Sequence, residues 1–205
     1  VLERQTLQLL AACATIFPSG YALLAADTLF AAEREIACRA LSRVVICIGG
    51  REFGPSVAKL DRLYDALTDG SEFKGSTLSG CNIVRAGPEV LVSREVRTKV
   101  SPVDIQFGKT IYWDHRFKVT FSEAGGDGST AHKLGFLGRH GWQSVLQDAP
   151  ELANRHEPFT VKISLPTIFD LDGISQIPHL GYMRVGKQRA IEPASFIKKI
   201  QFCPP

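Results

Sequence analysis

The sequence lacks the cysteine pattern of a disulfide-stapled or zinc-binding protein. Its five cysteines are an odd number, and no two of them are spaced as Cys-x-x-Cys. Three of the five lie in apolar runs, where a cysteine packs as a small hydrophobic residue. Thiols of this kind are typical of a reducing compartment. We therefore expect reduced cysteines, no metal site and a cytoplasmic location.

The sequence also lacks a segment that could anchor it in a membrane or direct its export. No apolar run approaches the roughly 18–20 residues needed to span a bilayer. The N-terminus carries Glu3 and Arg4 and continues as an amphipathic stretch, which is unlike a signal peptide. We expect no membrane partner. The chain starts at Val1 rather than at a methionine, and we expect it to be part of a longer protein.

Motifs of the common catalytic and metal centres are missing as well. Asp170 and Asp172 are separated by one residue before Gly173, which is typical of a turn rather than of a catalytic carboxylate pair. Neither a G-x-S-x-G elbow nor a cysteine-nucleophile signature occurs. The histidines are scattered and form no metal-ligand motif: His115, His132, His140, His156 and His179. We predict structural roles for them, and no catalytic or metal-ligating residue.

Two adjacent glycines, Gly49 and Gly50, raise the question of a phosphate-binding loop. Such a loop needs a preceding strand and a G-x-x-x-x-G-K-[ST] or G-x-G-x-x-G motif. Residues 33–48 instead have helical periodicity, and no Lys-Ser or Lys-Thr pair follows the glycines. A glycine just past a helix end is a common stop, because it has no Cβ to clash. The pair is predicted to end a helix.

Charge is nearly balanced overall but clustered around this glycine pair. A formal net charge of +3 permits a polyanionic partner without requiring one. Basic residues recur on both sides of the glycines: Arg34, Arg39, Arg43, Arg51, Lys59 and Arg62. Two interpretations stay open, namely nucleic-acid binding and a solvated surface. In the second, Glu35 pairs with Arg39, and Asp61 and Asp65 flank Arg62.

Hydrophobic periodicity predicts helices in the first third of the chain and strands in the rest. Helices are expected at residues 7–17, 33–48, 55–70 and 140–150, with a short extended piece and a helical turn at 21–32. Strands are expected at residues 76–96, 110–125, 159–166 and 173–182. In the second of these strands Tyr112, Trp113 and Phe117 could stack on bases, but an alternating strand more often buries its aromatic residues.

The order of elements, helices first and strands second, predicts an α+β fold. We expect an N-terminal helical domain over residues 1–72 and a mainly antiparallel β-rich domain over residues 73–205.

Five segments occur in the order expected of a tRNA(Ile)-lysidine synthetase. They are ALSRVVICIGGREFGPSVAKLDRLYDAL at residues 40–67, TLSGCNIV at 77–84, LVSREV at 91–96, WDHRF at 113–117 and IPHLGY at 177–182. Through them, most of the chain resembles the part of that family C-terminal to its catalytic domain, in a form like that of alphaproteobacteria.

The resemblance implies a role in tRNA modification. The complete enzyme adenylates C2 of the wobble cytidine of an isoleucine tRNA with ATP, and lysine then displaces AMP to give lysidine. ATP, used with Mg²⁺, is held by an N-terminal PP-loop domain that carries an S-G-G-x-D-S motif. That motif is absent from these 205 residues. No adenylating residue is therefore carried over, and we expect this chain alone to be inactive and to hold no cofactor.

What the resemblance implies for this chain is a substrate-specificity domain and a C-terminal domain that recognise tRNA(Ile). Their other partner would be the PP-loop domain of the same protein. The six basic residues around the glycine pair would contact tRNA phosphates. Two alternatives stay open: a stand-alone module that binds RNA or another polyanion, and a structural domain that supports the catalytic domain or a homodimer.

Overall fold

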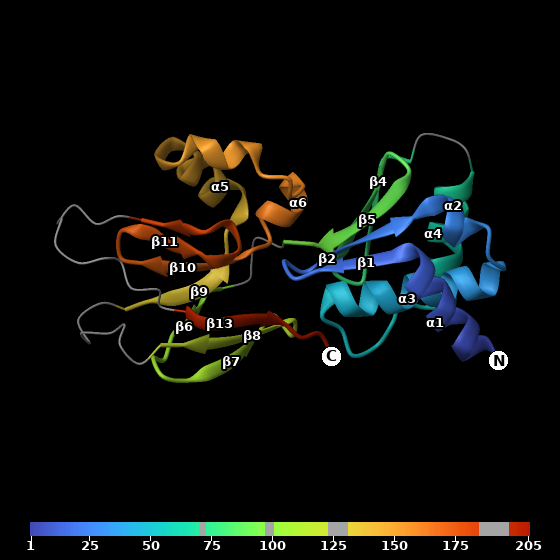
Figure 1. Cartoon of the computed structure of the whole chain (residues 1–205), viewed down its shortest axis with the longest axis horizontal. Helices are drawn as coiled ribbons and strands as arrows, with labels where there is room; N and C mark the ends of the chain where they lie inside the picture. The colour runs from blue at the N-terminus through green and yellow to red at the C-terminus, as the bar shows by residue number, and fades with distance from the viewer. Residues whose placement is uncertain (70–72, 97–100, 123–130, 185–196) are drawn as a thin grey trace. The chain divides into compact units, whose positions relative to one another are not determined.

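The computed structural model describes residues 1–69, 73–96, 101–122, 131–184 and 197–205 (Figure 1). The chain forms two compact units, one of residues 1–95 with Pro204 and Pro205, the other of residues 96–203. As expected from the sequence, the fold is α+β, with a helical N-terminal region followed by antiparallel sheets.

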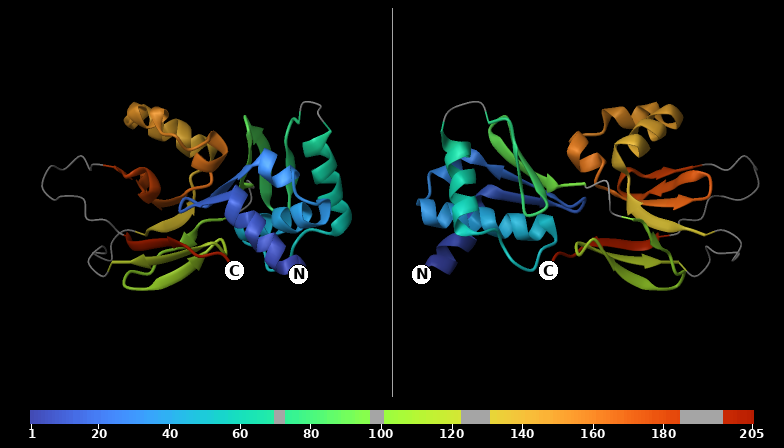
Figure 2. Two further views of the ribbon diagram at one scale, coloured as in Figure 1. Left: turned by 45° about the vertical axis from the view of Figure 1, so that its right-hand side comes forward. Right: turned by 180° about the vertical axis from the view of Figure 1, so that it is seen from behind.

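In the described part of the first unit, four helices pack with a five-stranded antiparallel sheet. Its helices are α1 (Leu2–Cys13), α2 (Ala26–Phe30), α3 (Arg34–Gly49) and α4 (Val57–Thr68). Its strands are β1 (Ala14–Phe17), β2 (Tyr21–Ala25), β3 (Ser76–Leu78), β4 (Cys81–Ala86) and β5 (Glu89–Arg94). The order in the sheet is β1-β2-β5-β4-β3. Helix α3 lies against β2, β4 and β5 and also contacts the other three helices, so it is the centre of the unit (Figure 2).

The helical periodicity of the apolar residues at 33–48 explains the position of α3. Its apolar stripe is buried and consists of Ile36, Ala37, Ala40, Leu41, Val44, Val45 and Ile48. The helix ends as predicted, because Gly50 adopts a left-handed conformation with φ 57° and ψ 44°. Gly49 has a separate role. A Cβ on it would stand 2.5 Å from the Ser79 carbonyl oxygen, so the β3–β4 turn approaches the helix at a point where no side chain fits.

Several elements of the first unit differ from the sequence prediction. Residues 14–17 form strand β1 rather than the end of the first helix, because they pair with β2 as an antiparallel hairpin around Gly20. Helix α4 begins at Val57 rather than at Pro55, since Ser56 is its N-cap. The helical turn expected after the extended piece is present as α2.

The division between the units also differs from the expected boundary near residue 72. Strand β5 pairs with β2 from Ala22↔Val92 to Ala25↔Glu89, which brings β3, β4 and β5 into the sheet of the first unit. Those strands have the predicted tight turns between them, but their pairing partner lies about seventy residues earlier in the chain. The change of hydrophobic periodicity near residue 72 therefore marks where β3, β4 and β5 follow one another, not where the first unit ends.

The described residues of the second unit form two antiparallel sheets and two α-helices. The larger sheet has the order β12-β11-β10-β9-β6, and the smaller one has the order β13-β8-β7. The larger sheet consists of β6 (Val103–Asp104), β9 (Lys133–Phe136), β10 (Pro166–Asp170), β11 (Gly173–Ile177) and β12 (Tyr182–Met183). The smaller sheet consists of β7 (Thr110–Trp113), β8 (Phe117–Phe121) and β13 (Ile197–Phe202). The helices are α5 (Gly138–Asp148) and α6 (Phe159–Lys162), with 3-10 turns at Pro150–Asn154 and Pro178–Leu180.

The core of this unit joins the two sheets. Its buried members come from β7, β8, β9, β10 and β13: Trp113, Phe117, Val119, Phe121, Leu134, Ile168 and Ile197. The predicted apolar face of residues 110–125 is therefore confirmed for the residues described. It belongs to a hairpin rather than to one long strand, since Asp114 and His115 form a turn with φ 53° and 54°. Neither an Asn-Gly nor an Asp-Gly pair marks this turn in the sequence.

Residues 159–162 form helix α6 instead of the predicted strand. The turn begins after Pro158, whose carbonyl accepts hydrogen bonds from the amides of Val161 and Lys162. Lys162 is buried, and its Nζ donates to the Arg155 carbonyl at 2.8 Å while lying over the Trp142 ring. Burial of Val161 and these contacts outweigh the strand preference of a Thr-Val pair.

Candidate nucleic-acid interface

The predicted basic residues all lie in the first unit, on α3, on α4 and in the connection between them. Helix α3 carries Arg34, Arg39 and Arg43, α4 carries Lys59 and Arg62, and Arg51 follows the helix stop. Arg43 is half-buried and the other five are exposed. The structure therefore leaves these side chains accessible to a partner, but it gives them different neighbours.

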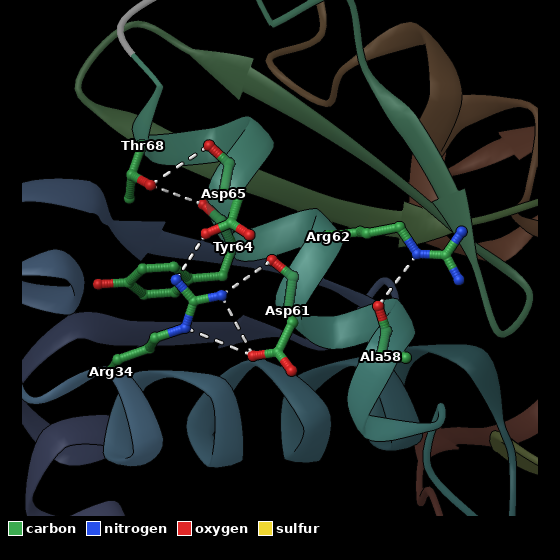
Figure 3. Close-up of polar contacts among 7 residues, drawn as sticks. All are labelled: Arg34, Ala58, Asp61, Arg62, Tyr64, Asp65 and Thr68. Carbon is green, nitrogen blue, oxygen red and sulfur yellow. Dashed lines mark hydrogen bonds and ion pairs between the residues drawn. The ribbon is translucent and has the colours of Figure 1, made fainter.

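Arg34 joins α3 to α4 (Figure 3). Its guanidinium lies 3.2 Å from an Asp61 carboxylate oxygen and 2.5 Å from one of Asp65, and it also covers the Tyr64 ring at 4.8 Å. The hydrogen bond from Arg34 lowers the pKa of the Asp65 carboxyl. The two aspartates expected to flank Arg62 thus pair with Arg34 instead.

Arg39 and Arg43 also contact carboxylates. Arg39 pairs with Glu35 one turn earlier at 2.8 Å, as the i,i+4 spacing predicted. Arg43 reaches Glu3 of helix α1 at 2.5 Å, a contact between residues forty positions apart that the local sequence does not indicate. Each of these pairs is exposed, and exposed pairs contribute between zero and about 1 kcal/mol.

Lys59 and Arg62 are exposed on α4, outside its buried stripe. That stripe consists of Leu60, Leu63 and Leu67, while Lys59 and Arg62 are three positions apart and share one face. The Arg62 Nε donates to the Ala58 carbonyl of its own helix at 3.1 Å, and its side chain points away from Arg34 (Figure 3). Among the residues that the structure describes, neither of these two cations forms an ion pair.

Arg51 meets a second arginine that sequence reasoning missed. A Cβ placed on Gly80 would stand 3.5 Å from Arg51 Nε and even closer to a guanidinium nitrogen of Arg94. Arg94 Nη1 donates to the Gly80 carbonyl at 3.0 Å. The two guanidinium groups therefore lie side by side at the β3–β4 turn. The segment LVSREV contains Arg94, but only the pairing of β5 with β4 brings it to the helix stop.

A groove of about 660 Å³ lies between α3 and α4. Cys38, Ser42 and Leu60 line it, with Arg34 and Arg39 at its rim. Burial raises the pKa of the Cys38 thiol, so this group is protonated at neutral pH and is a weak nucleophile.

The remaining candidates in the second unit have structural positions. Asp170 accepts a hydrogen bond from the Asp172 amide at 2.9 Å, which is the predicted turn, and it also pairs with Arg184. The His132 ring packs edge-on against Phe107 and the His179 ring against Phe117. Within the described residues, no group of three or more His, Cys, Asp or Glu side chains could hold a metal ion, and no helix is long and apolar enough to cross a membrane.

Comparison with known proteins supports the resemblance seen in the sequence segments. No protein-family model matches the chain. The chain is 25% identical over 172 residues to the tRNA(Ile)-lysidine synthase of Rickettsia rickettsii (strain Sheila Smith), a match that covers 82% of this chain and 35% of that protein. It is 24% identical to the tRNA(Ile)-lysidine synthase of Rickettsia akari (strain Hartford), over 82% of this chain and 39% of that protein.

A third match comes from another genus. The tRNA(Ile)-lysidine synthase of Wolbachia pipientis wMel is 26% identical over 109 residues, which cover 53% of this chain and 25% of that protein. The chain is thus similar to tRNA(Ile)-lysidine synthases along most of its length. It spans about a third of the length of the Rickettsia relatives that it matches.

Proposed function

We propose that this chain is the tRNA-recognition portion of a tRNA(Ile)-lysidine synthetase. In that role it positions tRNA(Ile) in the cytoplasm for a PP-loop domain of the same protein, which binds ATP with Mg²⁺ and lysine and modifies the wobble cytidine. The observation that carries the proposal is the match to tRNA(Ile)-lysidine synthases over 82% of the chain. The accessible cations of the first unit support it, because clustered Arg and Lys side chains are the usual contacts to RNA phosphates.

The six predicted cations contribute unequally in this proposal. Lys59, Arg62 and Arg51 have no ion-pair partner among the described residues, so a phosphate meets their full charge. Arg34 contributes indirectly, since it neutralises Asp61 and Asp65, which would otherwise repel a phosphate beside Arg62. Arg39 and Arg43 can exchange their exposed carboxylates for phosphates at small cost. Arg94 joins Arg51 at the β3–β4 turn.

Filter binding of tRNA(Ile) to the 205-residue chain at several salt concentrations tests this assignment. The double variant Lys59→Gln with Arg62→Gln is expected to bind several-fold more weakly than the wild type at low salt. Its plot of log K against log salt should also be less steep, by about 1 for each phosphate that the variant no longer neutralises. Both effects follow from the release of fewer counterions.

A double variant with the same loss of charge in the second unit, Lys133→Gln with Arg139→Gln, is the control. It is expected to keep the wild-type salt slope. Equal affinities for the α4 variant, the control and the wild type would show that α4 does not contact tRNA. If a generic RNA duplex competes as well as tRNA(Ile), the chain is a general polyanion module instead.

A further inference from the structure

The smaller sheet of the second unit has an open face that carries an aromatic ring among cations. Its inner face supplies Trp113, Phe117 and Val119 to the core, so the alternate residues point outward. The strand registers align these outward residues in two rows. One row contains Tyr112, Lys118 and Gln201, and the other contains Thr110, Thr120 and Lys199.

Tyr112 is the large aromatic of this face. It is 65% exposed, whereas the neighbouring Trp113 is 4% exposed and Phe117 is fully buried. The expectation that the hairpin buries its aromatic residues holds for those two and is wrong for Tyr112. The Lys118 Nζ lies over one face of this ring, 5.8 Å from its centroid.

All the charged side chains in the two rows are positive. Lys118 and Lys199 are exposed on adjacent strands, and the remaining described members of the two rows are neutral. The side-chain hydroxyl groups of Thr110 and Thr120 form a hydrogen bond with each other at 2.9 Å. The face therefore offers an accessible ring, two ammonium groups and an amide, with no carboxylate in either row to repel an anion.

We propose that this face binds unpaired nucleotides of an RNA, with one base stacked on the Tyr112 ring and the adjoining phosphates contacted by Lys118 and Lys199. Exposed aromatic side chains on an antiparallel sheet bind single-stranded RNA because every base has a π-face, and flanking cations follow the backbone. The inference rests on the proposed tRNA-binding role, but it assigns a separate surface, in the other unit, to a separate feature of the RNA.

Two labelled RNA hairpins test the assignment by fluorescence anisotropy with the full chain. One hairpin has a blunt end, and the other carries a tail of unpaired adenosines. The wild type is expected to bind the tailed hairpin more tightly. Tyr112→Thr keeps a residue of high strand preference at this position but removes the ring, so the preference for the tail should fall by about fivefold or more. Tyr112→Phe keeps the ring and should keep the preference.

Lys118→Gln is expected to weaken binding of the tailed hairpin, while Lys133→Gln, an exposed lysine on β9 of the other sheet, leaves it unchanged. The α4 double variant Lys59→Gln with Arg62→Gln should weaken both hairpins equally and keep the ratio of their affinities. A wild-type chain that binds both hairpins without preference, or a Tyr112→Thr chain with the wild-type ratio, overturns this inference and leaves the proposed function standing. A chain that binds neither hairpin also overturns this inference, whereas the proposed function is overturned only if the filter assay detects no binding of tRNA(Ile).

Discussion

At the residue scale, glycines are required at positions where backbone and side chains converge. Gly80 has φ 81°, and a Cβ there would collide with the guanidinium of Arg94. Gly87, in the next turn, has φ 62° but nothing within 4 Å of the same position. Alanine substitutions at the two glycines therefore distinguish the cost of a left-handed backbone from the cost of displacing the Arg94 side chain.

Gly87→Ala is expected to lower the free energy of unfolding by about 1 kcal/mol, the cost of a left-handed alanine. Gly80→Ala should cost about 2 kcal/mol or more, because Arg94 must also leave the Gly80 carbonyl. Urea unfolding of the two variants measures the difference. Equal losses would show that Arg94 does not hold this turn. Gly80→Ala should also weaken tRNA binding if the Arg51–Arg94 pair contacts phosphate.

Arg116 is a buried cation held against a buried carboxylate. It is fully buried, and its Nε lies 2.7 Å from Asp114, whose side chain is 7% exposed. Asp114→Asn keeps a residue that tolerates φ 53° but removes the negative charge beside the guanidinium. We expect a loss of about 3–5 kcal/mol in unfolding free energy, measured by thermal or urea unfolding. His115→Asn, at the adjacent exposed position with φ 54°, should change stability little.

At the scale of elements, the sequence could predict what depends on neighbours along the chain. The apolar stripe of α3, the stop at Gly50 and the Glu35–Arg39 pair all follow from spacings within one helix. The strand at residues 14–17 depends on its pairing with β2. Helix α6 at residues 159–162 depends on its start after Pro158 and on the contacts of Lys162 with Arg155 and Trp142. The periodicity of the segments themselves therefore misassigned both. The same limit applies to the site. Arg34 is one of the predicted basic residues, but its partners on α4 depend on how the two helices pack.

The contact of Arg34 with α4 predicts a pH-dependent stability. Because the pKa of Asp65 is lowered in the folded chain, the pair stabilises the fold above the ordinary carboxyl pKa of about 3.9 and this contribution is lost as the pH falls through the lowered value. Arg34→Gln should therefore melt below the wild type at pH 7 in low salt. Differential scanning fluorimetry should show this gap narrow in acid and in high salt. A gap that persists in acid would mean that Arg34 acts through packing on Tyr64 instead.

At the scale of the whole molecule, the sequence predicted the α+β class but not the extent of each unit. A change from helical to alternating periodicity marks the start of the consecutive strands β3, β4 and β5, whereas the pairing of β5 with β2 decides which unit they complete. The first unit consequently has its own sheet, its own central helix and all six predicted cations. The second unit has its own two-sheet core and the open face around Tyr112.

This division predicts that the two proposed RNA contacts can be separated. A chain of residues 1–95 contains every strand of its sheet, so it is expected to unfold in one cooperative transition by circular dichroism. It should bind the blunt and the tailed hairpin with equal affinity and retain most of the salt dependence, because the cations of α3 and α4 lie within it. The full chain should exceed it only for the tailed hairpin. If residues 1–95 already prefer the tail, unpaired nucleotides are bound by the first unit, and the face around Tyr112 is not needed to explain the preference.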